Sequence, residues 1–238
     1  MGESPNKLWR QEDKKTVENF SNSKYSFFSM NLDAVKSISC HFEKGKFYAL
    51  MGTSGSGKST LMQLINALVQ PTQGSILYQG KPIETFRPNE YRLKYVSLIH
   101  QNFCLLPFLN VLENVLYPTS LLKINKQEAR IQAIKQLETL GLDATYHKRM
   151  PSMLSGGEQQ RVAIARAMCT GAPVLTTDEP TGNLDSENAR HIASIFSRLA
   201  HEEKKTIIMV THDPEMAKQA DIVLHLKDGK LILNPSDM

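Results

Sequence analysis

The sequence predicts an α/β fold: a mostly parallel β-sheet with helices on both faces, an antiparallel β subdomain and an inserted α-helical subdomain. Residues 47–51, 174–177 and 206–210 are short runs rich in apolar and β-branched residues, which are typical of buried strands. Segments with helical periodicity lie between these runs. Strands that alternate with helices indicate a parallel sheet covered on both faces.

The N-terminal part of the chain is predicted to be rich in strands. We expect residues 1–14, which are polar and charged, to form a mobile extension before one domain at residues 15–238. Residues 16–80 have a strand-like pattern, with loose alternation at residues 37–52 and a hairpin predicted at residues 74–83. A helix is predicted at residues 60–70, ending before Pro71. Its apolar positions are Leu61, Leu64, Ile65 and Leu68.

The middle and C-terminal parts alternate between helices and strands. Residues 95–99 form another strand candidate, and a helical subdomain is expected at about residues 102–153. Its longest helix, after residue 126, should bury one face and end near Gly141. The expected buried positions are Ile131, Ile134, Leu137 and Leu140. A helix at residues 186–202 and a turn at Asp228-Gly229 complete the prediction.

Composition and charge exclude several classes of protein. The chain has 238 residues and a net charge of +4, from 28 Lys and Arg against 24 Asp and Glu. This excess is too small to indicate a nucleic-acid partner. Three cysteines without metal-ligand spacing indicate reduced thiols. Because no apolar run reaches the ~20 residues of a membrane-spanning helix and no signal peptide is recognisable, we expect a cytosolic protein.

A glycine-rich loop connects the strand at residues 47–51 to the following helix. Its pattern, Gly52-x-x-x-x-Gly57-Lys58-Ser59, is that of a phosphate-binding loop, in which backbone N–H groups and the helix N-terminus face the phosphates. Lys58 would reach the β- and γ-phosphates, and Ser59 would ligate Mg²⁺. The pattern predicts a nucleotide site without distinguishing ATP from GTP; a glycine-rich turn beside a surface lysine is the alternative. The predicted binding residues are Gly52, Thr53, Ser54, Gly55, Ser56, Gly57, Lys58, Ser59 and Thr60.

Polar side chains follow three other predicted strands. Asp178 ends one strand, where its carboxylate could hold Mg²⁺ through a water, and Glu179 could act as general base toward the attacking water. His212 and Gln101 each follow a strand, at the edge where parallel sheets bind ligands. His212 could orient the γ-phosphate and Glu179, and Gln101 could contact Mg²⁺. The alternatives are solvated surface residues for Asp178, Glu179 and Gln101, and a histidine whose hydrogen bonds are satisfied within its loop for His212.

Two glycines stand at the start of another predicted helix, in Ser155-Gly156-Gly157-Glu158. The Ser and Glu form a capping-box pattern, which explains the helix start and leaves the glycines unexplained. Residues without a Cβ expose N–H groups to a close, negatively charged ligand, so this element predicts a second phosphate site. Since the chain already has one phosphate loop, a dimer in which each helix start covers the partner's nucleotide is the economical solution.

These motifs together resemble the ATPase subunits of ABC transporters, over nearly the whole chain from about residue 16. The elements that occur in the order of that family are Gly52–Thr60, Gln101, Leu154–Arg161, Asp178-Glu179, Asn183-Leu184-Asp185 and His212. "DEPTGNLDS" and "QNFCLLPFLNVLENV" resemble the branch that contains lipoprotein-releasing, macrolide- and peptide-export and cell-division ATPases. The resemblance implies a P-loop NTPase fold with a RecA-like sheet.

The resemblance also implies roles for individual residues. ATP and Mg²⁺ are the expected cofactors, with Lys58, Ser59 and Thr60 at the phosphates and Asp178 and Gln101 at the metal. Glu179 would be the base, with His212 and Gln101 at the γ-phosphate. Ser155, Gly156 and Gly157 would close on the partner's ATP, and Asp185 would lie at the dimer interface. An aromatic residue would stack on adenine: Tyr25, with Phe27 and Phe28 as alternatives.

The implied assembly is a head-to-tail dimer of ATPase subunits bound to a separately encoded membrane permease. We expect the permease to dock near residues 101–118, and the protein to lie on the cytoplasmic side of the membrane. The expected substrate is lipophilic or peptide-like. An alternative is a mechanotransmission ATPase for cell division or envelope remodelling, which moves nothing across the bilayer. A soluble protein acting on ribosomes or DNA is a weaker alternative, because such proteins usually carry tandem ATPase domains or coiled coils.

Overall fold

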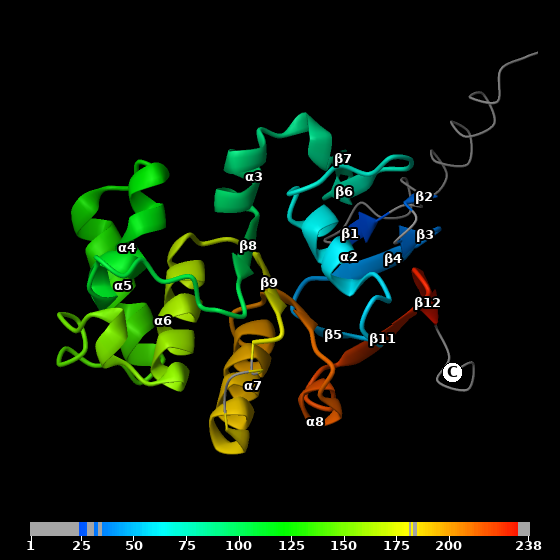
Figure 1. Ribbon diagram of the computed structural model, residues 1–238. Helices are drawn as coiled ribbons and strands as arrows, with labels where there is room; N and C mark the ends of the chain where they lie inside the picture. Colours follow the sequence, from blue (N-terminus) through cyan, green and yellow to red (C-terminus); the bar gives the residue numbers. More distant parts are fainter. Residues whose placement is uncertain (1–23, 28–30, 33–34, 181, 183–184, 233–238) are drawn as a thin grey trace, which may run out of the picture.

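A six-stranded sheet forms the centre of the protein, in a computed structural model that describes residues 24–27, 31–32, 35–180, 182 and 185–232. The predicted extension at residues 1–14 lies outside the described residues. The strand order is β12-β11-β5-β10-β9-β8 (Figure 1). The bounds are β5 Phe47–Met51, β8 Val96–Ile99, β9 Val174–Asp178, β10 Thr206–Val210, β11 Ile222–Lys227 and β12 Lys230–Ile232.

The sheet is parallel except at one edge. β5 pairs in parallel with β10 and β11, and β9 pairs in parallel with β10 and β8. Only β12 is antiparallel, joined to β11 through Asp228 and Gly229, both with positive φ. The predicted turn is therefore confirmed. The carboxyl ends of β5, β8, β9 and β10 meet at one edge of the sheet, where polar residues follow each strand.

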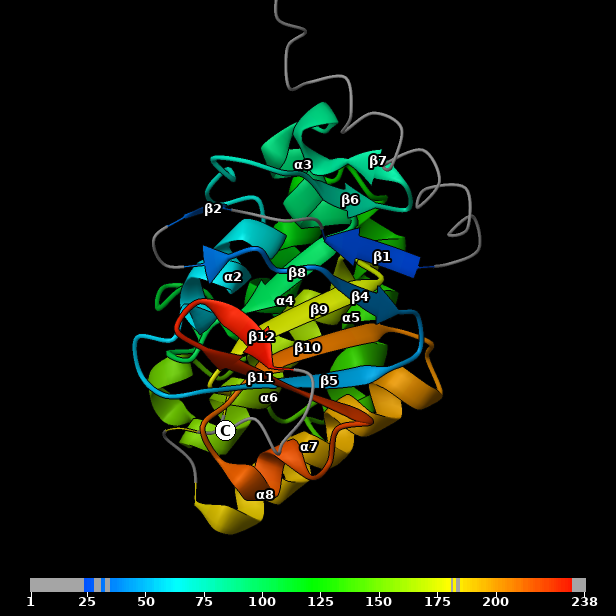
Figure 2. The same cartoon turned by 90° about the vertical axis from the view of Figure 1, so that its right-hand side faces the viewer.

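Both faces of the sheet are buried because its side chains alternate between two cores. Phe47 and Ala49 of β5 belong to the cluster beneath the helices α4 to α8. Tyr48 and Leu50 belong to the cluster beneath α2 and the antiparallel strands. The covering helices are α2 Lys58–Ile65, α4 Val111–Leu121, α5 Lys126–Thr139, α6 Gly156–Cys169, α7 Ser186–His201 and α8 Pro214–Ala217. Figure 2 shows α7 and α8 on one side of the sheet and α2 on the other.

A small antiparallel sheet covers the second core, as predicted. Its order is β4-β1-β6-β7, with β1 Lys24–Phe27, β4 Cys40–Glu43, β6 Ile76–Tyr78 and β7 Lys81–Pro82. The predicted hairpin is β6 with β7, turning at Gln79 and Gly80, which both have positive φ. β2 Asn31–Leu32 and β3 Val35–Lys36 pair separately. The 3₁₀ turn η1 Ile83–Thr85 and the helix α3 Pro88–Lys94, which the sequence analysis did not predict, lead into β8.

Helix α2 ends earlier than predicted. Asn66 is its C-cap and donates from Nδ2 to the carbonyl of Met62, and Ala67 then adopts a φ of 51°. A left-handed residue takes the chain out of the helix. Leu68, predicted to lie on the buried helical face, is 48% exposed instead. A capping contact therefore ended the helix well before Pro71.

Helices α4, α5 and α6, here called the helical lobe, pack against one another beside β8. The helices α4 and α5 and the 3₁₀ turn η2 Pro151–Met153 fall within residues 102–153. The predicted face of α5 is wrong at Ile131, which is 63% exposed, whereas Ala129 and Ala133 are buried. The buried residues of α5 are Ala129, Ala133, Gln136 and Leu137, a face at helical spacing that does not include Ile131.

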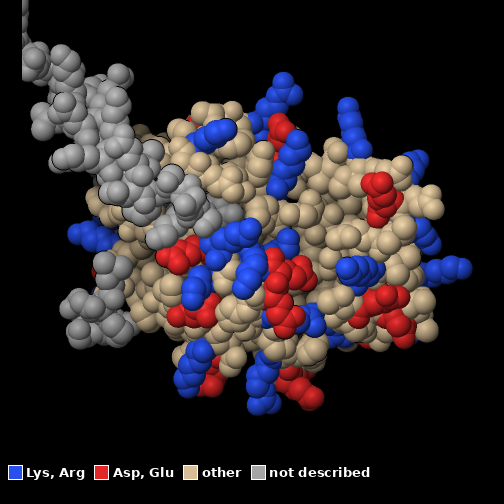
Figure 3. Space-filling model, turned by 180° about the vertical axis from the view of Figure 1, so that it is seen from behind, with Lys and Arg blue, Asp and Glu red and all other residues tan. Residues whose placement is uncertain are grey.

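Two properties of the surface complete the description. Within the described ranges, no helix combines the length and apolarity required to cross a membrane. On the face opposite to that of Figure 1, Lys and Arg are interspersed with Asp and Glu (Figure 3). This pattern agrees with the small net charge of +4.

Candidate functional site

A cavity of about 600 Å³ opens at the carboxyl ends of β5, β9 and β10. It contains most of the residues that the sequence analysis assigned to the nucleotide. The lining residues are Gly52, Thr53, Ser54, Gly55, Gly57, Lys58, Ser59, Thr60, Asp178, Glu179, Val210 and His212. Ser56 is buried behind the loop, and its main chain bonds to Gly229 on the β11–β12 turn. The fold therefore assembles one polar cavity from three separate segments.

The loop at residues 52–57 needs glycine at two positions for different reasons. A Cβ on Gly52 would lie 2.2 Å from the carbonyl oxygen of Leu226, so no side chain fits there. Gly57 is the N-cap of α2 and has a φ of 103°, which L-residues rarely adopt. The helix has no side-chain cap, so its first N–H groups are directed toward the cavity. Such a loop suits an anionic ligand.

Lys58 adds a positive charge to this loop. Its Nζ donates to the carbonyl oxygens of Gly52 and Thr53, both at 2.9 Å, and the residue is largely buried. It forms no ion pair within the described part of the chain. A buried ammonium group that donates to loop carbonyls suits an anionic ligand, because phosphate oxygens would add negative charge beside it.

The acidic side of the cavity begins at the end of β9. The carboxylate of Asp178 accepts a hydrogen bond from the Ser59 hydroxyl. Burial raises the pKa of Asp178, and the neighbouring Glu179 raises it further, whereas Ser59 and Lys58 act in the opposite direction. The site therefore disfavours the Asp178 charge until a cation offsets it. A hydroxyl and a carboxylate beside a phosphate loop are a donor set that fits Mg²⁺.

Glu179 and His212 meet across the mouth of the cavity. Nδ1 of His212 lies 2.9 Å from Oε1 of Glu179, and because a carboxylate only accepts, the imidazole donates. Glu179 has a φ of 46°, and its N–H donates to the carbonyl of Val210. Left-handed conformations of non-glycine residues concentrate at functional sites. The strained backbone directs this carboxylate into the cavity.

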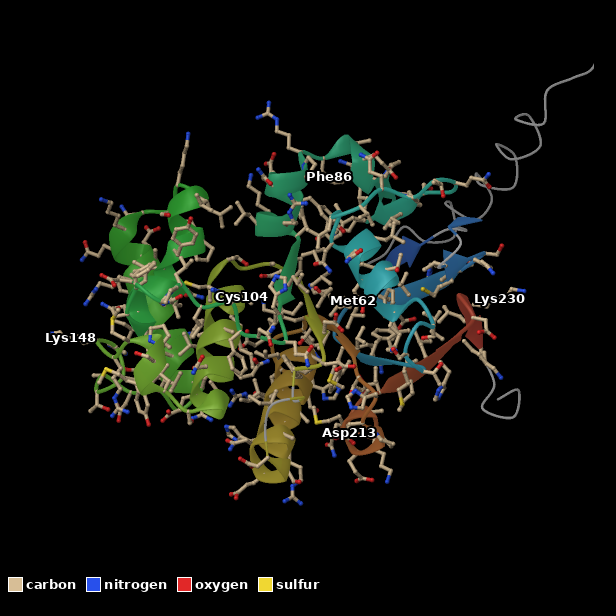
Figure 4. The ribbon with its side chains drawn as sticks, in the orientation of Figure 1. Met62, Phe86, Cys104, Lys148, Asp213 and Lys230 are labelled. Atoms are coloured by element: carbon tan, nitrogen blue, oxygen red, sulfur yellow. The ribbon has the colours of Figure 1, made fainter. Side chains whose placement is uncertain are left out.

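Gln101 lies on the turn after β8 and is not among the residues that line the cavity. Its Nε2 contacts Gly182, where an added Cβ would lie only 2.9 Å away. The turn continues through Phe103 and Cys104, with φ angles of 57° and 47°. Figure 4 shows Cys104 between β8 and the helical lobe. The structure thus places Gln101 beside the segment that follows Glu179.

Arg166 of α6 holds this turn, a role that the sequence analysis missed. Its guanidinium donates to the carbonyl oxygens of Cys104 at 2.6 Å and Phe103 at 2.7 Å. Burial lowers the pKa of Arg166. The available sequence signal was a basic residue within the mostly apolar stretch Val162–Met168. Arg166 therefore connects the helix that begins at Gly156 to the turn that carries Gln101.

The start of α6 forms as predicted but lies apart from the cavity. Ser155 is the N-cap and Glu158 completes the capping box. Ser155 is exposed and Gly157 is buried, and none of the residues 155–157 lines the cavity. A Cβ on Gly157 would lie 2.6 Å from Oδ1 of Asn188. Within the chain itself, Asn188 therefore leaves little space for a side chain at position 157.

Asp185 is also outside the cavity. Its Oδ1 accepts from the N–H groups of Glu187 and Asn188, and its Oδ2 accepts from Nδ2 of Asn188. These bonds lower the pKa of Asp185, with the N–H of Asn188 as the main cause. Asp185 is thus the N-cap of α7, and its assignment to a dimer interface stays a prediction.

The adenine-stacking residue also stays a prediction. The backbone of Tyr25 on β1 pairs with Phe42 of β4, and that of Phe27 pairs with Cys40. Phe28 lies outside the described residues.

A parallel sheet with a glycine-rich loop and helix at one strand end, and an acidic pair at another, defines a P-loop NTPase. Residues 35–182 match the family model described as ABC transporter. The chain is 42% identical over 225 residues to YvrO, an ABC transporter ATP-binding protein of Bacillus subtilis, covering 92% of this chain and 96% of YvrO. It is 41% identical over 204 residues to the macrolide export ATP-binding/permease protein MacB of Rhodopirellula baltica, covering 84% of this chain and 30% of MacB.

A solved structure also supports membership of the ABC transporter family. The dimeric, post-hydrolysis structure of the ATP-binding cassette MJ0796, bound to ADP and Pi, is similar with a TM-score of 0.76 and 31% identity, over 87% of this chain and 96% of that chain. The chain belongs to the ABC transporter family and is an ABC-type ATPase. The predicted family, fold class and enzyme class are confirmed.

Proposed function

We propose that the protein is the ATP-hydrolysing subunit of an ABC transporter and acts as a head-to-tail dimer on a separate membrane permease. The observation that carries the dimer is the separation of two anion-binding elements. The cavity lies at the start of α2, whereas the capped start of α6 lies elsewhere on the same chain. A second copy could bring its Ser155–Gly157 element to the open side of this cavity. The dimeric state of MJ0796 supports this proposal.

The residues of the cavity would have different roles in ATP hydrolysis. The loop N–H groups and Lys58 would bind the phosphates of ATP. Ser59 and Asp178, with Gln101 moving in from its turn, would hold Mg²⁺, which supplies positive charge to the phosphates when bound. Glu179 would accept a proton from the attacking water, and His212 would hold the Glu179 carboxylate in position. Within the described residues, no group of three or more His, Cys, Asp or Glu is arranged to hold a metal ion. Ser59, Asp178 and Gln101 would leave the remaining positions of Mg²⁺ to phosphate oxygens and water.

A groove beside the helical lobe is the proposed contact for the permease. It has a volume of about 340 Å³ and lies between α3, β8, α4 and α6. Its lining includes the half-exposed apolar side chains Tyr117 and Leu121, together with Cys104 and Arg166. A segment seated there would press on the turn that Arg166 holds, and so influence Gln101. Phe108, two residues after the groove-lining Leu106, is 90% exposed and is a second apolar candidate for this contact.

The similarity to MacB supports a finer proposal about substrate and location. MacB combines ATP-binding and permease parts in one chain and is described as a macrolide exporter. We infer a lipophilic or peptide-like substrate for the present protein, and a position on the cytoplasmic face of the membrane through its permease. ATP hydrolysis without substrate movement by the reconstituted complex would instead indicate a complex that transmits force.

The substitution Glu179→Gln tests the hydrolytic assignment. We expect Mg-ATP binding to persist, turnover to fall by roughly 10²-fold or more, and an ATP-bound dimer to accumulate. Light scattering after size exclusion measures the dimer. Glu215→Gln, an exposed residue on α8, is the matched control and should change neither property. Unchanged turnover in Glu179→Gln would remove this residue from its assigned role.

The double substitution Tyr117→Ala/Leu121→Ala tests the groove. We expect it to abolish co-purification with the permease and to leave the ATP-dependent dimer intact. Ile131→Ala, which removes an exposed apolar side chain from α5 outside the groove, is the control. Equal recovery of the permease with both variants would place the contact elsewhere.

A further inference from the structure

The start of α6 lies against the start of α7 within one chain. Three residues make this contact: Asp185 and Asn188 at the start of α7, and Gly157 at the start of α6. Asp185 accepts from Nδ2 of Asn188 at 2.7 Å and from the N–H of Asn188 at 2.9 Å. The Asn188 amide is therefore fixed at both its backbone and its side-chain nitrogen. Its other end, Oδ1, faces Gly157.

The contact at Gly157 leaves no space for a side chain. An ideal Cβ on this residue would lie 2.6 Å from Oδ1 and 2.9 Å from Cγ of Asn188. A flexible side chain could move aside, but the Asn188 amide is held by Asp185. The segment before Gly157 is also fixed, because Glu158 accepts from the N–H of Ser155 at 2.7 Å. The two helix starts thus form one connected unit.

We propose that Asn188, oriented by Asp185, is a positioning residue for the Ser155–Gly157 element, and that Asn188 is the reason why residue 157 is glycine. This inference rests on the proposed function, because the element acts on a partner's nucleotide. In consequence, Asp185 sets the position of the element that approaches the second nucleotide of the dimer. The competing explanation is that the partner's phosphates alone require glycine at this position.

A double-mutant cycle separates the two explanations. In the Glu179→Gln background, Gly157→Ala should weaken the ATP-dependent dimer by roughly tenfold or more, because the new methyl displaces the Asn188 amide. Asn188→Ala alone should weaken it only a few-fold. In the double variant Gly157→Ala/Asn188→Ala, the dimer should return to about the level of Asn188→Ala. Sedimentation at increasing protein concentration with saturating Mg-ATP gives the four dissociation constants of the cycle, including that of the Glu179→Gln parent.

Two additional variants distinguish positioning from simple packing. Asn188→Asp keeps the size of the side chain and loses the Nδ2 donor, so we expect a weaker dimer with unchanged Mg-ATP binding to the monomer. Ser194→Ala, an exposed position on α7, is the control and should leave both constants unchanged. An Asn188→Asp variant whose dimer constant equals that of the parent would overturn the positioning role.

The proposal is overturned if the effects of Gly157→Ala and Asn188→Ala simply add, since the constraint would then come from the partner. Should Gly157→Ala fail to fold, the same cycle is read from thermal unfolding, where Asn188→Ala must restore folding. Should Glu179→Gln itself remain monomeric with Mg-ATP, the proposed dimer fails. The unfolding cycle would still decide whether Asn188 restricts Gly157.

Discussion

Nδ1 of His212 lies 2.9 Å from Oε1 of Glu179, although the two residues follow different strands of the sheet. The first prediction concerns this pair. His212→Ala should lower turnover by roughly 10²-fold, because Glu179 loses the donor that orients it, while Mg-ATP binding by the free subunit changes little. Steady-state ATPase assays and nucleotide titration measure the two effects. His191→Ala, an exposed histidine on α7, is the control. Equal turnover in both variants would contradict the prediction.

The second prediction concerns Asp178 and pH. Because its folded pKa is raised, the folded state binds more protons than the unfolded state between the ordinary and the raised pKa. In the nucleotide-free protein, the contribution of Asp178 to the free energy of unfolding therefore falls as the pH rises through that interval. Asp178→Asn removes the charge, so we expect a higher melting temperature at neutral pH together with loss of Mg²⁺-dependent hydrolysis. Calorimetry from pH 4 to 8 should show the melting temperatures of the parent and of Asp178→Asn converging as the pH falls. A difference in melting temperature that is the same at every pH would refute the raised pKa of Asp178.

The third prediction concerns Arg166. Arg166→Ala should leave ATP binding intact and lower turnover several-fold, because the left-handed turn at Phe103 and Cys104 loses the donors that hold it. Hydrogen exchange of residues 101–106 should accelerate. Arg130→Ala on the exposed surface of α5 provides the comparison. The role of Arg166 fails if exchange in this turn is the same in the two variants.

The fourth prediction concerns a buried hydrogen bond beneath the site. Thr176 donates to Oδ1 of Asn66 at 2.9 Å, and both residues are fully buried. Thr176→Val would leave that oxygen without its donor, so we expect a loss of about 1–3 kcal/mol in the free energy of unfolding. Urea titration measures the change. Thr176→Ser, which keeps the hydroxyl donor, should lose less, and an equal loss in the two variants would contradict the hydrogen-bond explanation.

Local sequence patterns were sufficient for much of the fold. The predicted strands at residues 47–51 and 206–210 match β5 and β10 residue for residue. Each is a short apolar run buried on both faces, so its limits are visible in the sequence. The early end of α2 could not be predicted, because it depends on the contact of the Asn66 side chain with the Met62 carbonyl and on the left-handed Ala67, which apolar periodicity does not report. The exposed Ile131 likewise depends on which helices pack against α5.

In the candidate site, too, some residues were recognisable from local sequence and others depend on contacts between distant segments. The phosphate loop is continuous in sequence, so its spacing alone located the cavity. Asp178 and Glu179 were recognisable because a predicted strand ends on them. Arg166 contacts Cys104 across 62 positions of sequence, and no local pattern reports such a pairing. The same is true of Asn188 and Gly157, whose contact exists only once α6 and α7 have packed together.

The packing of the phosphate loop against β11 and the β11–β12 turn has a consequence for biosynthesis. Gly52 rests against the carbonyl of Leu226, and the Ser56 carbonyl accepts from the N–H of Gly229. We expect a nascent chain on the ribosome to retain no nucleotide until residue 229 has left the exit tunnel. The test is to stall synthesis shortly before residue 226 leaves the tunnel and to measure bound ATP. ATP binding by such chains would show that the phosphate loop can form without Leu226 and Gly229.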